Sequence, residues 1–431
     1  MFGSRLFPGG VHPHEGKNGK AVNGHNPIAQ LSAPPRVVIP LQQHIGAPAK
    51  ALVKKGDHVK VGQLIGEAGG YVSAPVHASV SGTVVDIQPC VLASGVQSPA
   101  VIIDNDYKEE WVELKPSTHP ETLSAAELQQ IVREAGIVGL GGATFPTDVK
   151  TVAGMGRVDT LIANACECEP YITADDALLC TYPEQVLRGM GVLMAVLEPK
   201  RAVLAVEDNK SEAVGILKKQ METFPGIELL ILPTRYPQGA EKQLIQAVTG
   251  RQVPPGALPK DVGCAVFNAA TFASIYKAVY EGEPVTRRIV TVTGEGVREP
   301  KNLIVRIGTP FSEVIAAAGG LTGDVWKVLS GGPMMGVAQA DLAVPVVKGT
   351  NAVLCLSRAQ DREGAHPQCI RCAKCVTACP MSLQPLYLYR FEQAGDLTAL
   401  RRLNLIDCIG CGCCAYVCPG RLPLVESFRA G

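Results

Sequence analysis

The sequence has no excess of charge of either sign: Lys and Arg together number 40, and Asp and Glu together also number 40. A protein that binds the phosphates of nucleic acid needs a basic surface, so this balance argues against nucleic-acid binding. No run reaches the roughly 18 to 20 apolar residues of a membrane helix, and residues 1–10 lack the apolar core of a signal peptide. We therefore expect a cytoplasmic chain without a transmembrane segment of its own, which would work at a membrane only as a peripheral subunit.

The chain has 431 residues, of which 46% are hydrophobic, and 15 of them are cysteines. This length and composition suit a protein of about two to four domains, each with its own core. Eight of the cysteines stand in the spacing of thiolate clusters, which fits a reducing compartment better than an oxidising one.

These eight cysteines form two copies of one pattern, CxxCxxCxxxCP, near the C-terminus. In bacterial two-cluster ferredoxins, three closely spaced cysteines bind one [4Fe-4S] cluster and the fourth, before proline, binds the other. We therefore predict crossed ligation. The predicted ligands are Cys369, Cys372, Cys375 and Cys418 for cluster 1, and Cys408, Cys411, Cys414 and Cys379 for cluster 2.

Two other interpretations of these cysteines are a disulfide framework and a pair of zinc sites, although zinc usually joins two CxxC units. Cys413 is a ninth thiol within the second motif and fits no ligand position. We interpret it as a small apolar residue near the cluster, with an alternative ligand as the other possibility.

The N-terminal third divides into two parts. Residues 1–35 are rich in Gly, Pro, His and Asn without periodicity, which predicts an irregular arm. Residues 36–115 contain short β-type runs, at 36–41, 72–74, 83–87 and 100–103, and resemble the barrel-sandwich hybrid of biotinyl and lipoyl carriers. No lysine lies between Lys60 and Lys108, where a carrier would hold its cofactor, so we predict a module for packing or docking.

Residues 120–284 alternate between strand-like and helix-like segments, which predicts a Rossmann-like domain with a mostly parallel sheet. Ligands of such sheets bind at the carboxyl ends of the strands. The expected strands are 158–163, 201–206 and 227–232, and the expected helices are 124–135, 183–197, 210–222 and 239–248.

Residues 285–345 resemble the SLBB β-grasp module, with strands at 288–293 and 302–307 and a helix at 311–318; a plain α+β spacer is the alternative. Residues 360–425 hold the two cysteine motifs, which helical sequence at 385–405 separates. The chain is thus predicted to be a multidomain α/β and α+β protein.

A glycine-rich loop, Gly139 to Thr147, is the second informative stretch. Dense glycines let backbone N–H groups approach a phosphate, and Lys150 could add a charge to the same anion. The loop fits neither the P-loop nor the GxGxxG pattern. It resembles the FMN-binding loop GxGGAGFPT in the flavin-bearing subunit of respiratory complex I.

That resemblance extends to the segment from Asn164 to Pro170, which is similar to the family's NADESEP, and to Gly239 and Glu241 of its GEE segment. It implies that Gly139, Gly141, Gly142 and Lys150 bind the FMN phosphate, and that Asn164 and Asn268 face the ring and ribityl chain. Glu169 and Glu241, with Glu167 and Gly239 beside them, would line the NAD(H) pocket. Glu167 or Glu169 could instead cap a helix that begins near Thr173.

Two positions depart from the family: Cys166 replaces an Asp, and Ala240 replaces a Glu. Cys166, Cys168 and Cys180 could also suggest a third metal site, but they lack further ligands at regular spacing, so we interpret them as buried thiols.

The order of arm, barrel-sandwich, FMN-type domain, SLBB-like module and paired cysteine motifs resembles the RnfC family of the Rnf ion-translocating NAD:ferredoxin oxidoreductase complex. The resemblance implies non-covalent FMN, two [4Fe-4S] clusters, NAD(H) as substrate, other complex subunits as partners and ferredoxin reached through them. It places the chain on the cytoplasmic side of the cell membrane. Because such cofactors carry the chemistry, we expect no catalytic side chain. The alternatives are a soluble reductase of the cobalamin-reductase type and a cluster relay without a nucleotide site.

Overall fold

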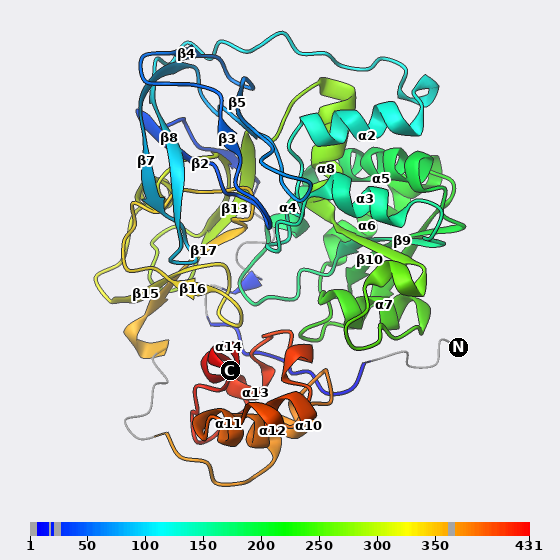
Figure 1. Cartoon of the computed structure of the whole chain (residues 1–431), viewed down its shortest axis with the longest axis vertical. Helices are drawn as coiled ribbons and strands as arrows, with labels where there is room; N and C mark the ends of the chain where they lie inside the picture. Colours follow the sequence, from blue (N-terminus) through cyan, green and yellow to red (C-terminus); the bar gives the residue numbers. More distant parts are fainter. Residues whose placement is uncertain (1–6, 17–18, 21–26, 361–366) are drawn as a thin grey trace.

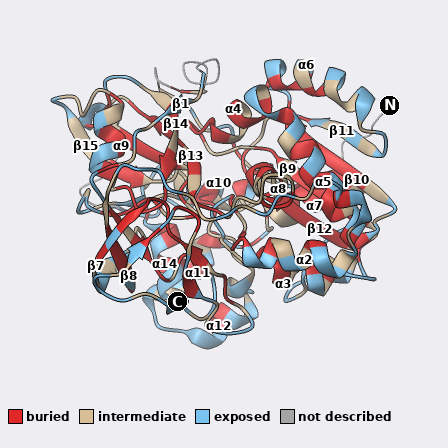
Figure 2. Cartoon of the chain, turned by 90° about the horizontal axis from the view of Figure 1, so that it is seen from above, coloured by how far each residue is buried: buried red, intermediate tan, exposed pale blue. Residues whose placement is uncertain are grey.

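A computed structural model of the chain describes residues 7–16, 19–20, 27–360 and 367–431 (Figure 1). Parts of the expected arm (1–6, 17–18 and 21–26) and the start of the expected cluster domain (361–366) lie outside the described residues. A β-rich part and an α/β part lie side by side, and a small helical part lies below them in Figure 1. Figure 2 shows that buried residues follow the strands and the inner sides of the helices.

The first folded part is the barrel-sandwich hybrid, built from two antiparallel sheets. One has the order β2-β8-β7-β4, and the other β3-β5-β6. Buried side chains from β2 and β8, among them Val37, Ile39 and Ile103, fill the space between them. The strands are β2 (Arg36–Pro40), β3 (Lys50–Ala51), β4 (His58–Val59), β5 (Leu64–Glu67), β6 (Val76–His77), β7 (Gly82–Val91) and β8 (Gln97–Asn105).

The expected strand at 72–74 is wrong, because these residues form a loop and β6 begins only at Val76. The Val72 carbonyl accepts a hydrogen bond from Ala47 N in the neighbouring loop. Pro75 has no N–H to donate to a ladder, so the strand starts after it.

The second part is a four-stranded parallel sheet with the order β11-β10-β9-β12 and helices packed around it. β9 and β10 are buried almost throughout, which agrees with the apolar runs that predict them. Its strands are β9 (Thr160–Ala165), β10 (Arg201–Glu207), β11 (Ile227–Leu232) and β12 (Cys264–Asn268). Its helices are α2 (Ala125–Glu134), α3 (Thr147–Gly154), α4 (Ala174–Thr181), α5 (Pro183–Leu197), α6 (Ser211–Gln220), α7 (Glu241–Thr249) and α8 (Ala269–Tyr276).

The third part is a six-stranded sheet with the order β1-β14-β13-β17-β15-β16. One edge strand, β1 (Ala29–Gln30), comes from the arm and pairs in parallel with β14. The sheet continues to Ser357 in β17, whose neighbours are β13 and β15. The other elements are β13 (Arg287–Thr293), β14 (Lys301–Arg306), α9 (Phe311–Ala317), β15 (Val325–Ser330), β16 (Val337–Ala338) and β17 (Ala352–Ser357).

The fourth part is the cysteine-rich domain. Its helices are α10 (Lys374–Ala378), α11 (Pro385–Gln393), α12 (Leu397–Arg402), α13 (Cys413–Tyr416) and α14 (Leu424–Ala430). The helical region expected at 385–405 is divided into α11 and α12. The break lies at Gly395, which has a φ of 67°, and Asp396 then caps α12 by accepting a hydrogen bond from Ala399 N.

Lys348 lies where the first three parts meet. It is fully buried, and its ammonium donates to the carbonyls of Pro75 and Gly136, each at 2.6 Å. Burial lowers the pKa of this lysine to about 7. A buried amine that binds two backbone carbonyls from different parts fixes their relative position.

The helices of the described residues are short or polar. None of them is both long enough and apolar enough to span a membrane.

Candidate functional site

The carboxyl ends of β9 and β12 bring two of the expected flavin-facing residues together. These strands are parallel neighbours, and Asn164 is the register partner of Asn268. Asn164 donates a hydrogen bond to the Gly239 carbonyl at 2.8 Å and accepts one from Cys166 N at 3.1 Å. Asn268 caps α8 by accepting from Ala270 N at 2.9 Å. Both amides are therefore held in fixed orientations at the edge of the sheet where α/β proteins bind ligands.

The glycine-rich loop lies against the same edge. Gly141 is so close to Asn268 that a Cβ on Gly141 would lie 3.3 Å from the Asn268 Cβ. Gly142 has a φ of 109°, and nothing described lies within 4 Å of where its Cβ would be. Gly139 closes the loop by donating to the Phe145 carbonyl at 2.8 Å. The loop thus presents bare backbone beside Asn268, with free space at Gly142.

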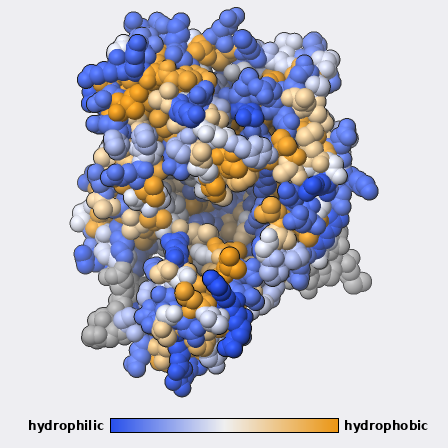
Figure 3. Space-filling view, in the orientation of Figure 1, coloured by the Kyte–Doolittle hydropathy of each residue, from blue (hydrophilic) through white to orange (hydrophobic). Residues whose placement is uncertain are grey.

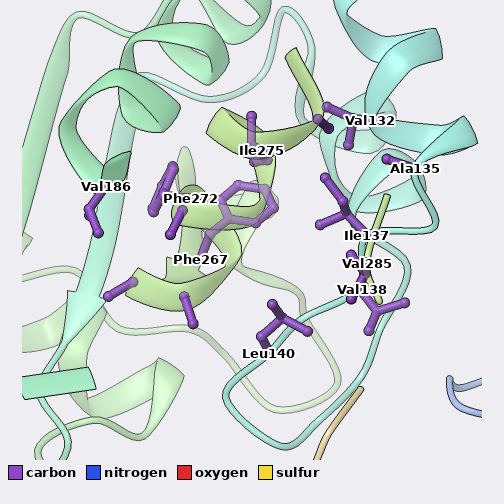
Figure 4. Packing of buried hydrophobic residues seen from close by; sticks show 14 of the residues in the cluster. Val132, Ala135, Ile137, Val138, Leu140, Val186, Phe267, Phe272, Ile275 and Val285 are labelled. Atoms are coloured by element: carbon purple, nitrogen blue, oxygen red, sulfur yellow. The ribbon is translucent and has the colours of Figure 1, made fainter. Parts of the chain in front are cut away.

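Leu140 anchors this loop to the core. Its side chain is buried among the hydrophobic residues around Phe272 of α8, as Figure 4 shows. Its N–H donates to the Thr271 hydroxyl at 3.0 Å, and its carbonyl accepts from Arg288 at 2.8 Å. The glycines on either side are therefore held in position by the residue between them.

Lys150 and Glu241 come together at the amino ends of two helices. The Lys150 ammonium lies 2.6 Å from a Glu241 carboxylate oxygen, and it also lies over the Phe267 ring at 5.2 Å from its centre. Lys150 belongs to the first turns of α3, directly after the glycine-rich loop, whereas Glu241 is the first residue of α7. The side chains expected to bind FMN and NAD(H) are thus an ion pair here.

Glu167 caps a helix. Its two carboxylate oxygens accept hydrogen bonds from the backbone N–H groups of Asp175 and Asp176, at 2.9 and 3.3 Å. These residues belong to the first turn of α4, where a carboxylate is favoured by unpaired N–H groups and the helix dipole. This is the helix-capping arrangement considered for this segment from the sequence.

Glu169 contacts the third part of the chain instead of a free pocket wall. One of its oxygens accepts from the N–H groups of Met334 and Met335, at 2.7 and 3.0 Å. Burial raises the pKa of this carboxyl, while the two backbone donors act in the opposite direction. Gly332 lies so close to the Glu169 side chain that a Cβ on Gly332 would overlap the Glu169 Cγ. The loop at 331–336 and Glu169 therefore fit together tightly.

Two charged residues near Asn268 were missed in the sequence. Asp175 accepts a hydrogen bond from the Asn268 amide at 2.5 Å, and burial followed by the nearby Glu167 carboxylate raises its pKa. Burial lowers the pKa of Arg288 to about 10, which the Asp175 charge partly offsets. Asp175 lies within the acidic stretch after β9, which could have indicated it, whereas nothing local marks Arg288.

The two cysteine motifs line two separate pockets in the cysteine-rich domain. Each pocket collects three cysteines of one motif and the pre-proline cysteine of the other. One is lined by Cys369, Cys372, Cys375 and Cys418, and the other by Cys379, Cys408, Cys411 and Cys414.

Both motifs follow the same backbone path. Arg371 and Ala373 in the first motif and Gly410 and Gly412 in the second all have positive φ, between 58° and 79°. Such left-handed residues turn successive N–H groups towards one side, a geometry that suits anionic groups including iron–sulfur clusters. Cys413 lines the second pocket and is fully buried, with its sulfur 4.0 Å from the Tyr236 carbonyl.

Cys166 and Cys168 lie between these two regions. Burial raises the pKa of Cys166 well above its usual value and that of Cys168 to about 12. The Cys168 sulfur accepts from Gly239 N at 3.3 Å. A Cβ on Gly239 would overlap the Cys166 carbonyl, so the segments of Asn164 and Glu241 meet at a residue that must be glycine. Cys180 is half-buried on α4, and burial raises its pKa to about 12.

Tyr236 connects the α/β part to the second cysteine motif. It is buried, and its hydroxyl donates to the Cys411 carbonyl at 2.7 Å. The arm is added on the same side, because Val11 N donates to the Tyr236 carbonyl and Gly10 N donates to the Ala378 carbonyl. The sequence gives no sign of these contacts, which join residues far apart in the chain.

Four family descriptions match successive parts of the chain. They are the RnfC barrel sandwich hybrid domain at residues 5–108, the Nuo51 FMN-binding domain at 132–277, the SLBB domain at 289–338 and the 4Fe-4S dicluster domain at 368–421. The predicted fold class is confirmed by these matches, and FMN and two [4Fe-4S] clusters are confirmed as the cofactors of the matching domains.

Solved structures support the fold of the larger parts. An NAD+-reducing [NiFe]-hydrogenase in its air-oxidized state matches with a TM-score of 0.51 and 20% identity, over 69% of this chain and 61% of that chain. The H2-reduced state gives the same TM-score with 22% identity, over 72% and 63%.

Relatives match nearly the whole chain, and each is named as the C component of a complex. That of the proton-translocating ferredoxin:NAD(+) oxidoreductase complex of Clostridium ljungdahlii is 44% identical over 94% of this chain and 88% of its own length. That of the Na(+)-translocating ferredoxin:NAD(+) oxidoreductase complex of Acetobacterium woodii is 42% identical over 98% and 95%. That of the ion-translocating oxidoreductase complex of Rhodobacter capsulatus is 42% identical over 98% and 81%. The chain belongs to the RnfC family, the C components of the ion-translocating ferredoxin:NAD(+) oxidoreductase complexes.

Proposed function

We propose that this chain is the redox subunit of a membrane-bound, ion-translocating complex and passes electrons between NAD(H) and ferredoxin. Its partners are the other subunits of that complex. The observation that carries the proposal is the hydrogen bond from Tyr236 to the Cys411 carbonyl, which joins the FMN-type domain directly to a cysteine pocket. A two-electron site and a one-electron site in direct contact are what NAD-linked iron–sulfur chemistry requires.

FMN fits the edge of the sheet where Asn164 and Asn268 meet the glycine-rich loop. Gly141 leaves no room for a side chain beside Asn268, while Gly142 leaves open space, so a phosphate could approach the backbone there. In this proposal Gly139, Gly141 and Gly142 bind the phosphate with Lys150, and the two asparagine amides orient the ring and ribityl chain. When bound, FMN supplies a group that takes two electrons as a hydride and releases them singly.

The clusters fit the two pockets, because each pocket offers four thiols on a backbone that turns its N–H groups inward. We propose that Cys369, Cys372, Cys375 and Cys418 bind one cluster and that Cys408, Cys411, Cys414 and Cys379 bind the other. The apolar residues around them, such as Leu383, Leu424 and Phe428, keep water away from the sulfurs and thereby influence the potentials.

For NAD(H), the proposed residues are Glu167, Glu169, Gly239 and Glu241. Glu167 and Glu169 already bind backbone N–H groups, so we propose that they shape the wall of the pocket rather than change partners. Glu241 pairs with a side chain, Lys150, and is two-fifths exposed, so it is the carboxylate most able to turn towards a nucleotide.

A second candidate function follows from the same contacts. Because Glu169 and Glu241 are both engaged, the subunit could be a relay that accepts electrons without a nucleotide site of its own. Anaerobic titration of the reconstituted chain with NADH separates the two. Bleaching of flavin absorbance supports the oxidoreductase; intact clusters and flavin without bleaching would support the relay.

We further propose that the subunit lies on the cytoplasmic side of the membrane, held there by its partner subunits. NAD(H) is a cytoplasmic substrate, and many free cysteines suit a reducing compartment. Protease treatment of right-side-out and inverted vesicles tests this: cleavage in the inverted vesicles alone is expected, and cleavage from the outside would refute it.

A further inference from the structure

The two cysteine pockets differ in what surrounds them. The pocket of Cys379, Cys408, Cys411 and Cys414 faces the rest of the chain. Tyr236 donates to the Cys411 carbonyl, and Gln243 of α7 donates to the Pro380 carbonyl at 3.3 Å. These two residues come from the carboxyl end of the parallel sheet and from the helix that begins at Glu241.

Two further segments contact the same pocket. Gly9 of the arm lies where a Cβ would be 2.5 Å from the Cys379 carbonyl. Gly412 lies against the loop at 331–336, because its Cβ would be 2.7 Å from the Met334 carbonyl. The same loop binds Glu169 through its N–H groups. The arm, the α/β part and the β-grasp part therefore all contact the pocket of the second motif.

The pocket of Cys369, Cys372, Cys375 and Cys418 lies at the surface. Cys369 and Cys372 are exposed, whereas Cys411 and Cys414 are buried. Ile370 between the two exposed cysteines is 66% exposed. Figure 3 shows the cysteine-rich domain as a lobe that projects below the rest of the chain.

The surface around this exposed pocket is basic. Arg371 and Lys374 are exposed and flank Cys372 in the sequence. An exposed apolar side chain next to cations is a surface that favours a partner with an acidic rim and an apolar centre. The charges would speed the encounter, and Ile370 would exclude water at the contact.

We propose that the face formed by Cys369, Ile370, Arg371, Cys372 and Lys374 is the docking surface for an acidic one-electron redox protein. The second motif then faces the FMN-type domain, and the first motif faces the partner. One electron passes at each docking event: one centre is oxidised, the other is reduced, and no bond forms or breaks. This inference rests on the proposed function, because it requires both pockets to hold clusters.

The exposure of the two pockets can be measured by magnetic resonance without turnover. The full chain is reconstituted anaerobically as Cys411→Ser, which keeps the first-motif cluster, and as Cys372→Ser, which keeps the other. A soluble dysprosium chelate should accelerate the spin relaxation of the reduced cluster several-fold more in Cys411→Ser than in Cys372→Ser. Equal or opposite effects would overturn the inference.

The docking surface is tested with charge reversal in the reconstituted wild-type background. Calorimetric binding of a soluble acidic two-cluster ferredoxin should weaken at least tenfold in Arg371→Glu/Lys374→Glu and should also weaken with salt. The matched control is Lys218→Glu/Lys219→Glu, the same charge change at two exposed residues of α6. Equal losses in both variants, or no loss in either, would overturn the surface.

Iron, sulfide and flavin analysis of every sample separates this failure from failure of the proposed function. Wild-type protein that lacks the two clusters and FMN after reconstitution contradicts the proposed function itself. Fully loaded protein with the wrong pattern of exposure or binding contradicts only the docking surface.

Discussion

The Lys150 ammonium and the Glu241 carboxylate lie 2.6 Å apart, although the two residues are 91 positions apart in the chain. Lys150 follows the glycine-rich loop, and Glu241 begins α7, whose Gln243 contacts the cysteine-rich domain. The residues proposed to bind the two nucleotides thus share one ion pair.

We expect Lys150→Met to weaken FMN binding about ten- to hundredfold, because a charge-assisted hydrogen bond contributes about 1.5–3 kcal/mol. The melting temperature should hardly change, since a partly exposed ion pair contributes about 0–1 kcal/mol. Fluorescence titration of the flavin-free protein with FMN measures the first effect, and calorimetry the second. Glu241→Gln is the matched variant: it should keep FMN and raise the KM for NADH. Equal loss of FMN in both variants would make the pair purely structural.

Replacing Gly141 with Leu should abolish FMN retention, because even a Cβ there lies 3.3 Å from Asn268 and a larger side chain would displace it. Flavin released on denaturation, per chain, is the measurement, and cluster absorbance should remain. Gly191→Leu is the control, as Gly191 lies on α5 with nothing described within 4 Å of its Cβ position. Stoichiometric FMN in Gly141→Leu would place the flavin elsewhere.

Cys379→Ser should damage the cluster bound by Cys408, Cys411 and Cys414, because these four cysteines line one pocket. Electron paramagnetic resonance of the reduced protein should keep the signal of the first-motif cluster and lose or change the other. Cys418→Ser should give the opposite result. If Cys379→Ser removes only the first-motif signal, the ligation is not crossed.

Ala373→Gly should stabilise the first-motif cluster. Ala373 has a φ of 60°, at the position that Gly412 occupies in the second motif, and a left-handed residue other than glycine costs about 1–2 kcal/mol. The rate of iron release to a chelator should fall several-fold. Ala399→Gly, in α12, should instead destabilise the domain by about 1 kcal/mol. Faster iron release from Ala373→Gly would contradict the assignment of strain to this residue.

Lys348 should give the protein a stability that rises with pH. Burial lowers its pKa in the folded chain to about 7 from its usual 10.5, so the unfolded chain binds more protons between these values. The contribution of this group to stability therefore increases as the pH rises from about 7 towards 10.5, and is constant below 7. Melting temperatures of wild type and Lys348→Met between pH 7 and 9 isolate the effect, since the cysteines titrate in both. Parallel curves would show that the pKa of Lys348 is not lowered in the fold.

Much of the architecture could be predicted because it is encoded locally. The apolar runs of β9 and β10 and the capping box of Ser124 and Glu127 at α2 are signals within a few residues. The cysteine spacing likewise predicts a two-cluster domain, because three ligands of each cluster lie in one loop.

The features that were not predicted depend on contacts between distant segments. β1 has only two residues and forms because β14 offers an edge to pair with. Glu169 has its partners at Met334 and Met335, and Tyr236 has its partner at Cys411, so neither contact leaves a local pattern. The ion pair of Lys150 and Glu241 was not expected either, since the resemblance assigned the two residues to different ligands.

The contact of Gly10 with Ala378 joins a segment made first during synthesis to one made near its end. A ribosome releases the arm long before the cysteine-rich domain exists, so the arm cannot reach its final position until then. The second-motif pocket, which the arm covers at Gly9, is therefore open in the newly made chain. Cluster insertion thus has a period of access that ends when the arm folds against the last domain.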